Sequence, residues 1–231
     1  MSRLSIIVPA LDEAAGIAEC LAALQPLRGR GVEVIVVDGG STDATAAIAT
    51  PLADRVVASS RGRAVQMNAG AQAASGDTLL FLHADTRLPE DADRLVLGGL
   101  EATGRAWGRF DVRIEGRSAL LPVVAAFMNA RSRLTAIATG DQAIFARREA
   151  FARAGRFPPI ALMEDIAFSR TMKRQGVPLC LRERAITSGR AWERRGPLRT
   201  IVLMWRLRLA FYLGADPARL AERYVSRRAT H

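Results

Sequence analysis

Cysteine, histidine and aromatic residues are scarce in this chain of 231 residues, and no uninterrupted apolar run is long enough to span a membrane. The two cysteines, Cys20 and Cys180, fall in a helix-like and a strand-like segment, where a reduced, structural role is the simplest interpretation. The N-terminal apolar run ends at Pro9, which is too early for a signal peptide. We therefore expect a cytoplasmic protein with one large folded domain.

Lysine is also rare, so arginine supplies almost all of the positive charge, and the net charge is +10. From Arg190 onward, ten arginines stand against three acidic residues. Such a segment is suited to nucleic acid, anionic lipid or a phosphorylated substrate, and a solvated basic surface is the alternative.

Internal repeats, low-complexity tracts and linkers are missing, whereas strand-like and helix-like segments alternate regularly over the first 85 residues. Strands are expected at 5–8, 32–37, 55–58 and 78–82. Alternation with short loops predicts an α/β fold whose mostly parallel sheet is flanked by helices. No G-x-G-x-x-G follows the first strand, which argues against a dinucleotide site.

The second half of the sequence is less regular. Residues 106–114 alternate apolar and polar side chains, which predicts a half-buried, antiparallel strand. A short strand is expected at 143–145, followed by a helix over 146–154. A long apolar helix is predicted over 198–213.

The strand at 78–82 is followed directly by His83, Ala84 and Asp85, a polar end that a buried strand does not need. In open α/β sheets, ligands bind outside the carboxyl ends of the strands. Mg²⁺ needs only one or two protein carboxylates when substrate phosphates supply further ligands. The pattern therefore predicts that Asp85 holds a divalent metal, which in turn holds a diphosphate. His83 is interpreted as a soft ligand tolerable for Mn²⁺ or as a hydrogen-bonding group, with a histidine of no role as the alternative.

Other candidate residues lie at neighbouring strand ends and helix starts. Glu13 and Asp38 follow the first two strands and should face the same crevice as Asp85, although Asp38 could instead cap its own turn. Arg63 opens a helix whose first amides favour an anion. Asp165 also begins a helix, where the dipole alone would favour an acidic residue; its functional interpretation is a general base that deprotonates an acceptor hydroxyl.

With these residues laid out, the chain resembles the family-2 glycosyltransferases of the GT-A fold. The resemblance is carried in order by segments 5–13, 36–43, 63–70, 81–85 and 164–165. It implies a nucleotide-diphospho-sugar donor, Mg²⁺ or Mn²⁺, and inversion at the anomeric carbon. Where the family has Asp-x-Asp, this sequence has His83-Ala84-Asp85, which resembles a small bacterial subgroup of such transferases with unassigned substrates.

Carried over by position, the resemblance makes Asp85 the metal ligand and Asp165 the catalytic base, and the segment at 140–142 lines the acceptor side. The residues predicted to contact the nucleotide or substrate are Pro9, Ala10, Glu13, Asp38, Arg63, Asn68, His83, Ala84, Gly140, Asp141, Glu164 and Trp192. For Trp192, a core anchor is the alternative.

Other functions and partners remain open at this point. A nucleotidyltransferase should have a Gly-rich, basic loop after the first strand, and Ala10-Leu11-Asp12-Glu13 stands there instead. A non-catalytic module for nucleotides or anions is a further alternative, although acidic strand ends would repel nucleic acid, and we expect none as a partner. The predicted organisation is a GT-A domain over 1–190 and a basic helical extension over 191–231. The helix at 198–213 could pack on the body, form a homodimer, or lie on an anionic membrane near a lipid-linked acceptor.

Overall fold

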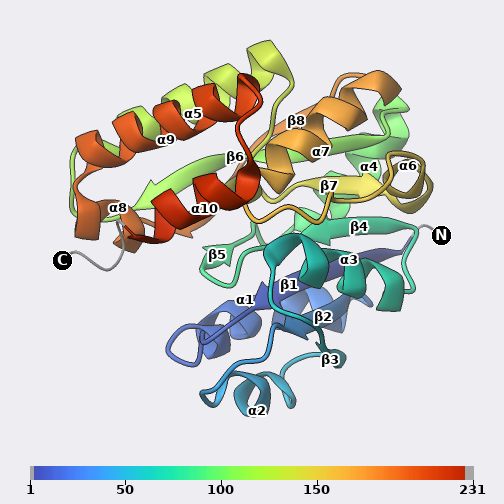
Figure 1. The fold of residues 1–231 in the computed structure, drawn as a ribbon. Helices are drawn as coiled ribbons and strands as arrows, with labels where there is room; N and C mark the ends of the chain where they lie inside the picture. The colour runs from blue at the N-terminus through green and yellow to red at the C-terminus, as the bar shows by residue number, and fades with distance from the viewer. Residues whose placement is uncertain (1–2, 227–231) are drawn as a thin grey trace.

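In the computed structural model, which describes residues 3–226, an eight-stranded mixed sheet runs through the molecule (Figure 1). The strand order is β3-β2-β1-β4-β7-β6-β8-β5. Strands β1 (Leu4–Ala10), β2 (Glu33–Asp38), β3 (Arg55–Ala58) and β4 (Thr78–Phe81) pair in parallel, as the alternating sequence pattern predicts. Their carboxyl ends therefore meet at one edge of the sheet.

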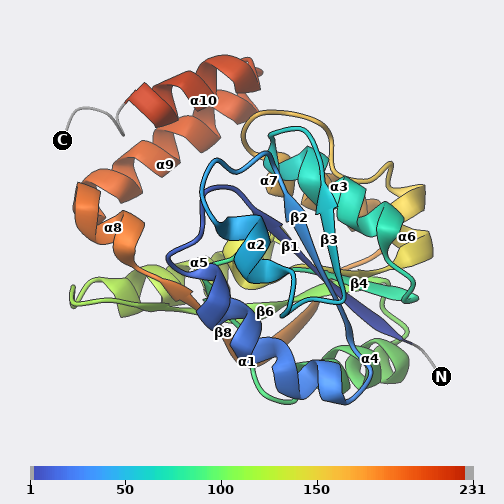
Figure 2. The ribbon, with the colours of Figure 1, turned by 90° about the horizontal axis from the view of Figure 1, so that it is seen from below.

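Helices cover both faces of this sheet because neighbouring side chains of a strand point to opposite sides. Ile6 packs with α1 (Ile17–Gly29), α2 (Thr45–Ala49) and α4 (Ala92–Thr103). On the other face, Ile7 packs in a cluster with α3 (Arg63–Ala73), α6 (Arg148–Arg153) and α7 (Glu164–Met172). Figure 2 shows α1 and α4 on one side of the strands and α3, α6 and α7 on the other.

The second half of the sheet is mixed. Strand β6 (Trp107–Glu115) is antiparallel to β7 (Phe145–Arg147), as predicted, but parallel to the long strand β8 (Leu179–Ser188) on its other edge. The two-residue strand β5 (Thr86–Arg87) closes the sheet antiparallel to β8.

The strand expected at 143–145 starts only at Phe145, and the following helix starts at Arg148 instead of at 146. Ala143 has a φ of 46°, a left-handed conformation that a strand cannot contain. It directly follows a single 3₁₀ turn, η1 (Gly140–Gln142). The second 3₁₀ turn, η2 (Lys173–Gln175), follows α7.

The last helices lie against the second half of the sheet. Here α8 (Arg190–Arg195) and α9 (Pro197–Tyr212) run beside α5 (Leu121–Thr135), and α10 (Pro217–Ser226) packs across α9 (Figure 1). Within residues 3–226, no helix is long and apolar enough to cross a bilayer. The division of the chain at residue 190 stays a prediction.

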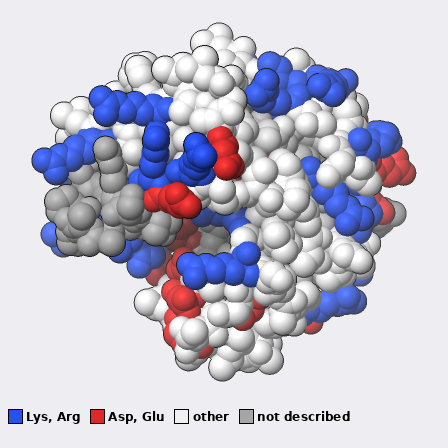
Figure 3. All heavy atoms as spheres, in the orientation of Figure 1, with Lys and Arg blue, Asp and Glu red and all other residues white. Residues whose placement is uncertain are grey.

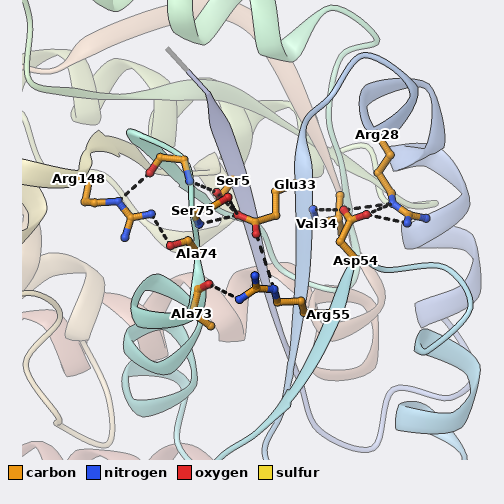
Figure 4. Close-up of polar contacts among 11 residues, drawn as sticks. Ser5, Arg28, Glu33, Val34, Asp54, Arg55, Ala73, Ala74, Ser75 and Arg148 are labelled. Carbon is orange, nitrogen blue, oxygen red and sulfur yellow. Dashed lines mark hydrogen bonds and ion pairs between the residues drawn. The ribbon is translucent and has the colours of Figure 1, made fainter. Parts of the chain in front are cut away.

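A buried polar network joins β1 and β2 at the edge opposite their carboxyl ends (Figure 4). Glu33 accepts hydrogen bonds from Ser5 Oγ at 2.6 Å and from the Ser75 amide at 2.7 Å. Burial alone would raise the pKa of Glu33, but these hydrogen bonds and the charge of Arg55 bring it below the usual value. The network is therefore satisfied within the protein, and it pairs the amino ends of the strands whose carboxyl ends carry the predicted site.

Candidate active site

The loops after β1 and β2 are tied to each other at the edge of the sheet. The amide of Glu13 donates to Thr45 Oγ1 at 2.8 Å, and the amide of Thr42 donates to Asp12 Oδ1 at the same distance. Asp38 accepts hydrogen bonds from the amide and hydroxyl of Ser41. Asp38 therefore caps its own turn, which is the alternative role that the sequence allowed. Its contact with a nucleotide stays a prediction.

Gln66 is a residue of this region that the sequence patterns did not single out. Its amide nitrogen donates to Ala10 O at 2.8 Å and to Val37 O at 2.9 Å, which joins α3 to the ends of both β1 and β2. Gly39 permits this arrangement, because a Cβ there would lie 2.9 Å from the Gln66 side chain. An isolated Gln on a helix carries no periodic signal, so only the packed structure reveals this role.

Four segments predicted separately from the sequence meet in one cavity. Arg63 Nη1 lies 3.7 Å from Glu164 Oε1, and His83 Nδ1 lies 3.2 Å from Asp141 Oδ1. The amide of Gly140 donates to Asp165 Oδ2 at 2.9 Å. The cavity is lined by Arg63, Met67, Phe81, His83, Gly140, Ile144, Phe157, Glu164 and Asp165.

Gly140 allows the turn η1 to lie directly against His83. A Cβ at this position would come within 2.3 Å of His83 Nε2, so no other residue fits without displacing the imidazole. His83 Nε2 is itself buried and has no hydrogen-bond partner among residues 3–226. Its Nδ1 bond to Asp141 and its packing on Gly140 place His83 in the cavity of Asp165, which favours the hydrogen-bonding interpretation.

The two acidic residues at the start of α7 differ in environment. Asp165 is oriented by two amides, since its Oδ1 also accepts from Ile166 N at 2.7 Å. Glu164 is buried with 4% exposure, and burial, followed by the charge of Asp165, raises its pKa against the opposing charge of Arg63. Met163 precedes them with a φ of 70° and turns the chain so that both carboxylates enter the cavity.

Two predicted substrate contacts have structural roles here. Asn68 Nδ2 donates to Phe157 O at 2.8 Å, and Asn68 Oδ1 accepts from Phe157 N at 3.1 Å, so both its polar atoms hold the chain before α7. Trp192 packs on the apolar cluster of α5, with Leu121 and Val124. Both residues therefore have structural partners, which for Trp192 is the core-anchor alternative, and their contacts with a substrate stay predictions.

Asp85 opens onto a second cavity of about 320 Å³, between the start of α1 and strand β8. Its lining comprises Ala15, Gly16, Glu19, Cys20, Ala84, Asp85, Thr86, Arg87, Glu115, Ile186, Thr187, Ser188 and Arg190. Asp85 is exposed, and the hydrogen bond that it accepts from Thr86 Oγ1 is long, at 3.4 Å. Its carboxylate therefore has oxygen lone pairs available for a ligand.

Charged residues of both signs surround Asp85, because Glu19, Glu115, Arg87 and Arg190 line the same cavity. Burial, then the negative charges of Asp85, Glu13 and Glu19, raise the pKa of the Cys20 thiol to about 12. Among residues 3–226, no group of three or more histidine, cysteine or acidic residues is arranged to hold a metal ion. A divalent cation at Asp85 would therefore take most of its ligands from water and from the phosphates of a substrate, which is the usual arrangement for Mg²⁺.

Comparison with known proteins decides the family. The sequence pattern of the family described as "Glycosyl transferase family 2" matches residues 5–153. The chain belongs to glycosyl transferase family 2. A curated relative of this family 2 chain is the "PGL/p-HBAD biosynthesis glycosyltransferase" of Mycobacterium tuberculosis, 40% identical over 98 residues. The match covers 39% of this chain and 38% of that relative, so the chain aligns with well under half of the relative's length.

Solved structures share the GT-A fold with this family 2 chain. TarS of S. aureus in complex with UDP-GlcNAc superposes with a TM-score of 0.66 at 18% identity, covering 81% of this chain and 59% of TarS. Mannosyltransferase PcManGT from Pyrobaculum calidifontis, in complex with GDP-Man and Mn²⁺, gives 0.66 at 22% identity over 92% and 62%. Glucosyl-3-phosphoglycerate synthase from Mycobacterium tuberculosis, with Mn²⁺ and UDP, gives 0.61 at 24% identity over 92% and 79%.

Proposed function

We propose that this family 2 chain transfers a sugar from a nucleotide-diphospho-sugar donor to an acceptor hydroxyl, with inversion and with a divalent metal. The observation that carries the proposal is the meeting of Arg63, His83, Gly140 and the Glu164–Asp165 pair, beside the strand end that bears Asp85. TarS and PcManGT, whose structures contain UDP-GlcNAc and GDP-Man, support a donor of this class.

The donor side is assigned to Asp85 and Arg63. A Mg²⁺ or Mn²⁺ ion held by Asp85 would neutralise charge on the diphosphate as it leaves. Arg63 is the first residue of α3, and its side chain is 53% exposed although it is paired at 3.7 Å with Glu164. Its guanidinium and the first amides of α3 can therefore meet a diphosphate beside this cavity, which at about 10 Å³ is too small to enclose one.

The acceptor side is assigned to Asp165. One carboxylate oxygen takes the proton of the acceptor hydroxyl while the acceptor oxygen forms a bond to the anomeric carbon. The bond between that carbon and the diphosphate oxygen breaks on the opposite side, which inverts the configuration. The amides of Gly140 and Ile166 hold the carboxylate in one orientation, so no side-chain rotation is needed before the proton moves.

The two alternatives have less support. The loop after β1 is Ala10-Leu11-Asp12-Glu13, without the glycines and the basic residue that a nucleotidyltransferase would place on a triphosphate. A module that only binds nucleotides would not need an oriented carboxylate such as Asp165 beside a buried Glu164. Donor binding, measured together with transfer by the Asp165→Asn and Asp85→Asn variants, would distinguish these two functions from sugar transfer.

The donor class is testable by thermal unfolding with UDP, GDP, CDP and TDP, each with and without Mn²⁺. We expect one diphosphate at 100 times its Kd to stabilise the protein by about 2.7 kcal/mol, a rise in Tm of roughly 5–10 °C, only with Mn²⁺. Pyrophosphate with Mn²⁺ is the control for simple anion binding. Equal shifts with pyrophosphate, or none with any nucleotide, would contradict the proposed donor.

The C-terminal helices expose an apolar surface, for which packing on the body, a homodimer and a membrane contact were the predicted alternatives. The face of α9 turned to the body carries Thr200, Leu203 and Leu207. Ten exposed apolar side chains of α9, of its neighbour α5 and of the residues that cap them are here called the apolar face. They are Leu198, Val202, Trp205, Leu209, Tyr212 and Leu213, with Leu120, Val123, Phe127 and Leu134. Trp205 and Phe127 are 70% and 71% exposed.

We propose that the apolar face lies on an anionic membrane. Arg199 and Arg206 are exposed on α9 next to the apolar stripe, where they can meet acidic headgroups while the apolar side chains enter the interface. In Figure 3, Lys and Arg side chains border uncharged surface at the upper left, where Figure 1 places α5 and α9. A basic rim favours lipid over a second copy of this chain, because two such rims would repel each other.

Flotation with vesicles tests this attachment. The protein should float with vesicles that contain phosphatidylglycerol and bind pure phosphatidylcholine weakly. Replacing Trp205 and Leu209 together by Glu should weaken binding by about tenfold or more. Val177→Glu is the control, because Val177 is 63% exposed but lies outside the apolar face. A concentration-dependent dimer that the double variant abolishes, without vesicle binding, would assign the face to a second copy.

A further inference from the structure

Two arginines near the proposed base have buried side-chain nitrogens without a hydrogen-bond partner among residues 3–226. Arg131 lies on α5 and Arg208 on α9. The Nε and Nη2 atoms of Arg131 and the Nε atom of Arg208 are buried without a hydrogen-bond partner among residues 3–226. Guanidinium nitrogens that are buried without a partner lose their hydration, which is unfavourable unless an anion replaces the water.

Two other arginines of the chain, one fully buried and one half-buried like Arg131 and Arg208, do have protein acceptors. Arg109 is fully buried and donates to Asp111 and to Ser132 Oγ. Arg148 donates to the carbonyls of Ala71, Ala74 and Gly76 at 2.7–3.1 Å. The fold can therefore provide acceptors for buried guanidiniums, and it leaves those buried nitrogens of Arg131 and Arg208 without them.

Electrostatics places this pair on the acceptor side of the site. Burial, then the positive charge of Arg208, lower the pKa of Arg131 to about 10, while the charge of Asp165 acts in the opposite direction. Burial would raise the pKa of Asp141, but its His83 hydrogen bond and the charges of Arg63 and Arg208 lower it. Arg131 and Arg208 therefore lie close enough to repel each other, and each lies close to an acidic residue of the cavity.

The backbone positions of both arginines are held by packing. Ser132, which follows Arg131, is fully buried and accepts a hydrogen bond from Arg109. Leu207, which precedes Arg208, packs with Ile166, the neighbour of Asp165. The two helices run side by side (Figure 1), so packing fixes the backbone from which both side chains extend.

We propose that Arg131 and Arg208 bind a phosphate group of the acceptor, so that the acceptor is a phosphorylated compound whose hydroxyl is presented to Asp165. This inference rests on the proposed sugar transfer. Two guanidiniums match the charge and the oxygen geometry of a phosphate dianion. The donor diphosphate is assigned to Asp85 and Arg63, which leaves this pair for a second anion. The phosphate can belong to a soluble compound or to a lipid.

Binding of inorganic phosphate tests the pair without turnover. Calorimetric titration into the protein, alone and with the Mn²⁺–nucleotide complex found by thermal unfolding, should show phosphate binding. Arg131→Met and Arg208→Met should each weaken it at least tenfold and leave nucleotide binding unchanged. The matched control Arg133→Met changes an exposed arginine on the same helix as Arg131 and should bind phosphate like wild type. Glycerol 3-phosphate and farnesyl phosphate, compared as competitors, distinguish a soluble from a lipid source.

A thermal readout separates ligand binding from a structural role. Because removal of an unpaired buried cation relieves its burial, Arg131→Met and Arg208→Met should melt at or above the wild-type Tm without phosphate. Variants that melt lower and still bind phosphate would overturn the inference, as would a wild type that does not bind phosphate at millimolar concentration. If phosphate binds through this pair but no nucleotide binds, the proposed sugar transfer fails and the anion site stands.

Discussion

Replacing Asp165 by Asn is expected to lower kcat for sugar transfer by about 10²–10⁴-fold, the range typical for loss of a general base. Asn has nearly the same shape, and its carbonyl oxygen can still accept one of the two amide hydrogen bonds, from Gly140 or from Ile166. The change removes the proton acceptor and leaves the cavity intact. Steady-state transfer assays measure the loss, and Mn²⁺-dependent thermal shifts with the donor nucleotide should stay at wild-type values.

Glu164→Gln is the matched control for this prediction. Glu164 pairs with Arg63, so its loss should affect the donor side and reduce kcat less than the loss of Asp165. The raised pKa of Glu164 means that its contribution to stability is present below the unfolded-state pKa and is lost as pH rises through the folded-state pKa. Glu164→Gln should therefore flatten the decline in Tm over that pH interval. If Glu164→Gln abolished transfer while Asp165→Asn retained it, the base would be Glu164.

Replacing Asp85 by Asn is expected to abolish the Mn²⁺-dependent thermal shift with nucleotide and to lower kcat/KM by about 10³-fold or more. Asp85 is the carboxylate at the tip of β4, and no alternative set of three metal ligands exists among residues 3–226. Asn keeps an oxygen donor but loses the charge that holds a divalent ion between protein and diphosphate.

Asp91→Asn is the control for Asp85, because Asp91 is an exposed carboxylate before α4, outside both cavities. It should keep both the nucleotide shift and the transfer rate. Asp85→Asn should not change the Tm without ligand, since Asp85 accepts only a long hydrogen bond from Thr86. A variant that kept a full Mn²⁺-dependent nucleotide shift would show that Asp85 does not hold the metal.

The strand-end pattern correctly places His83 and Asp85 after the same strand, but it does not predict which residues each of them meets. The two residues flank Ala84, yet they face different cavities, Asp85 with β8 and His83 with Asp165. In an extended chain, residues two positions apart point to the same side, so alternation alone would place His83 and Asp85 together. The turn at residues 84–85 separates them. The His83–Asp141 bond joins residues 58 positions apart, and no local pattern encodes such a contact.

The apolar helix over 198–213 was correctly placed, and one of its faces packs on the body, while the environment of its exposed side stays a prediction. Its sequence is apolar on more than one face, so periodicity could not decide which face would be buried. Arg131 and Arg208 were not singled out at all, because single arginines on helices are most often solvated. Only the packed arrangement of α5 and α9 shows that some of their side-chain nitrogens are buried without a protein acceptor.

The sequence by itself determined the parallel half of the sheet, the positions of Glu13, Asp38 and Asp85 at strand ends, and the family to which the chain belongs. These features depend on local signals, namely apolar periodicity, turn residues and motif order. The tertiary structure decided which distant groups meet: Asp165 with Gly140, Asn68 with Phe157, and two arginines with each other. Such contacts depend on packing between elements far apart in the chain, which short-range preferences do not specify.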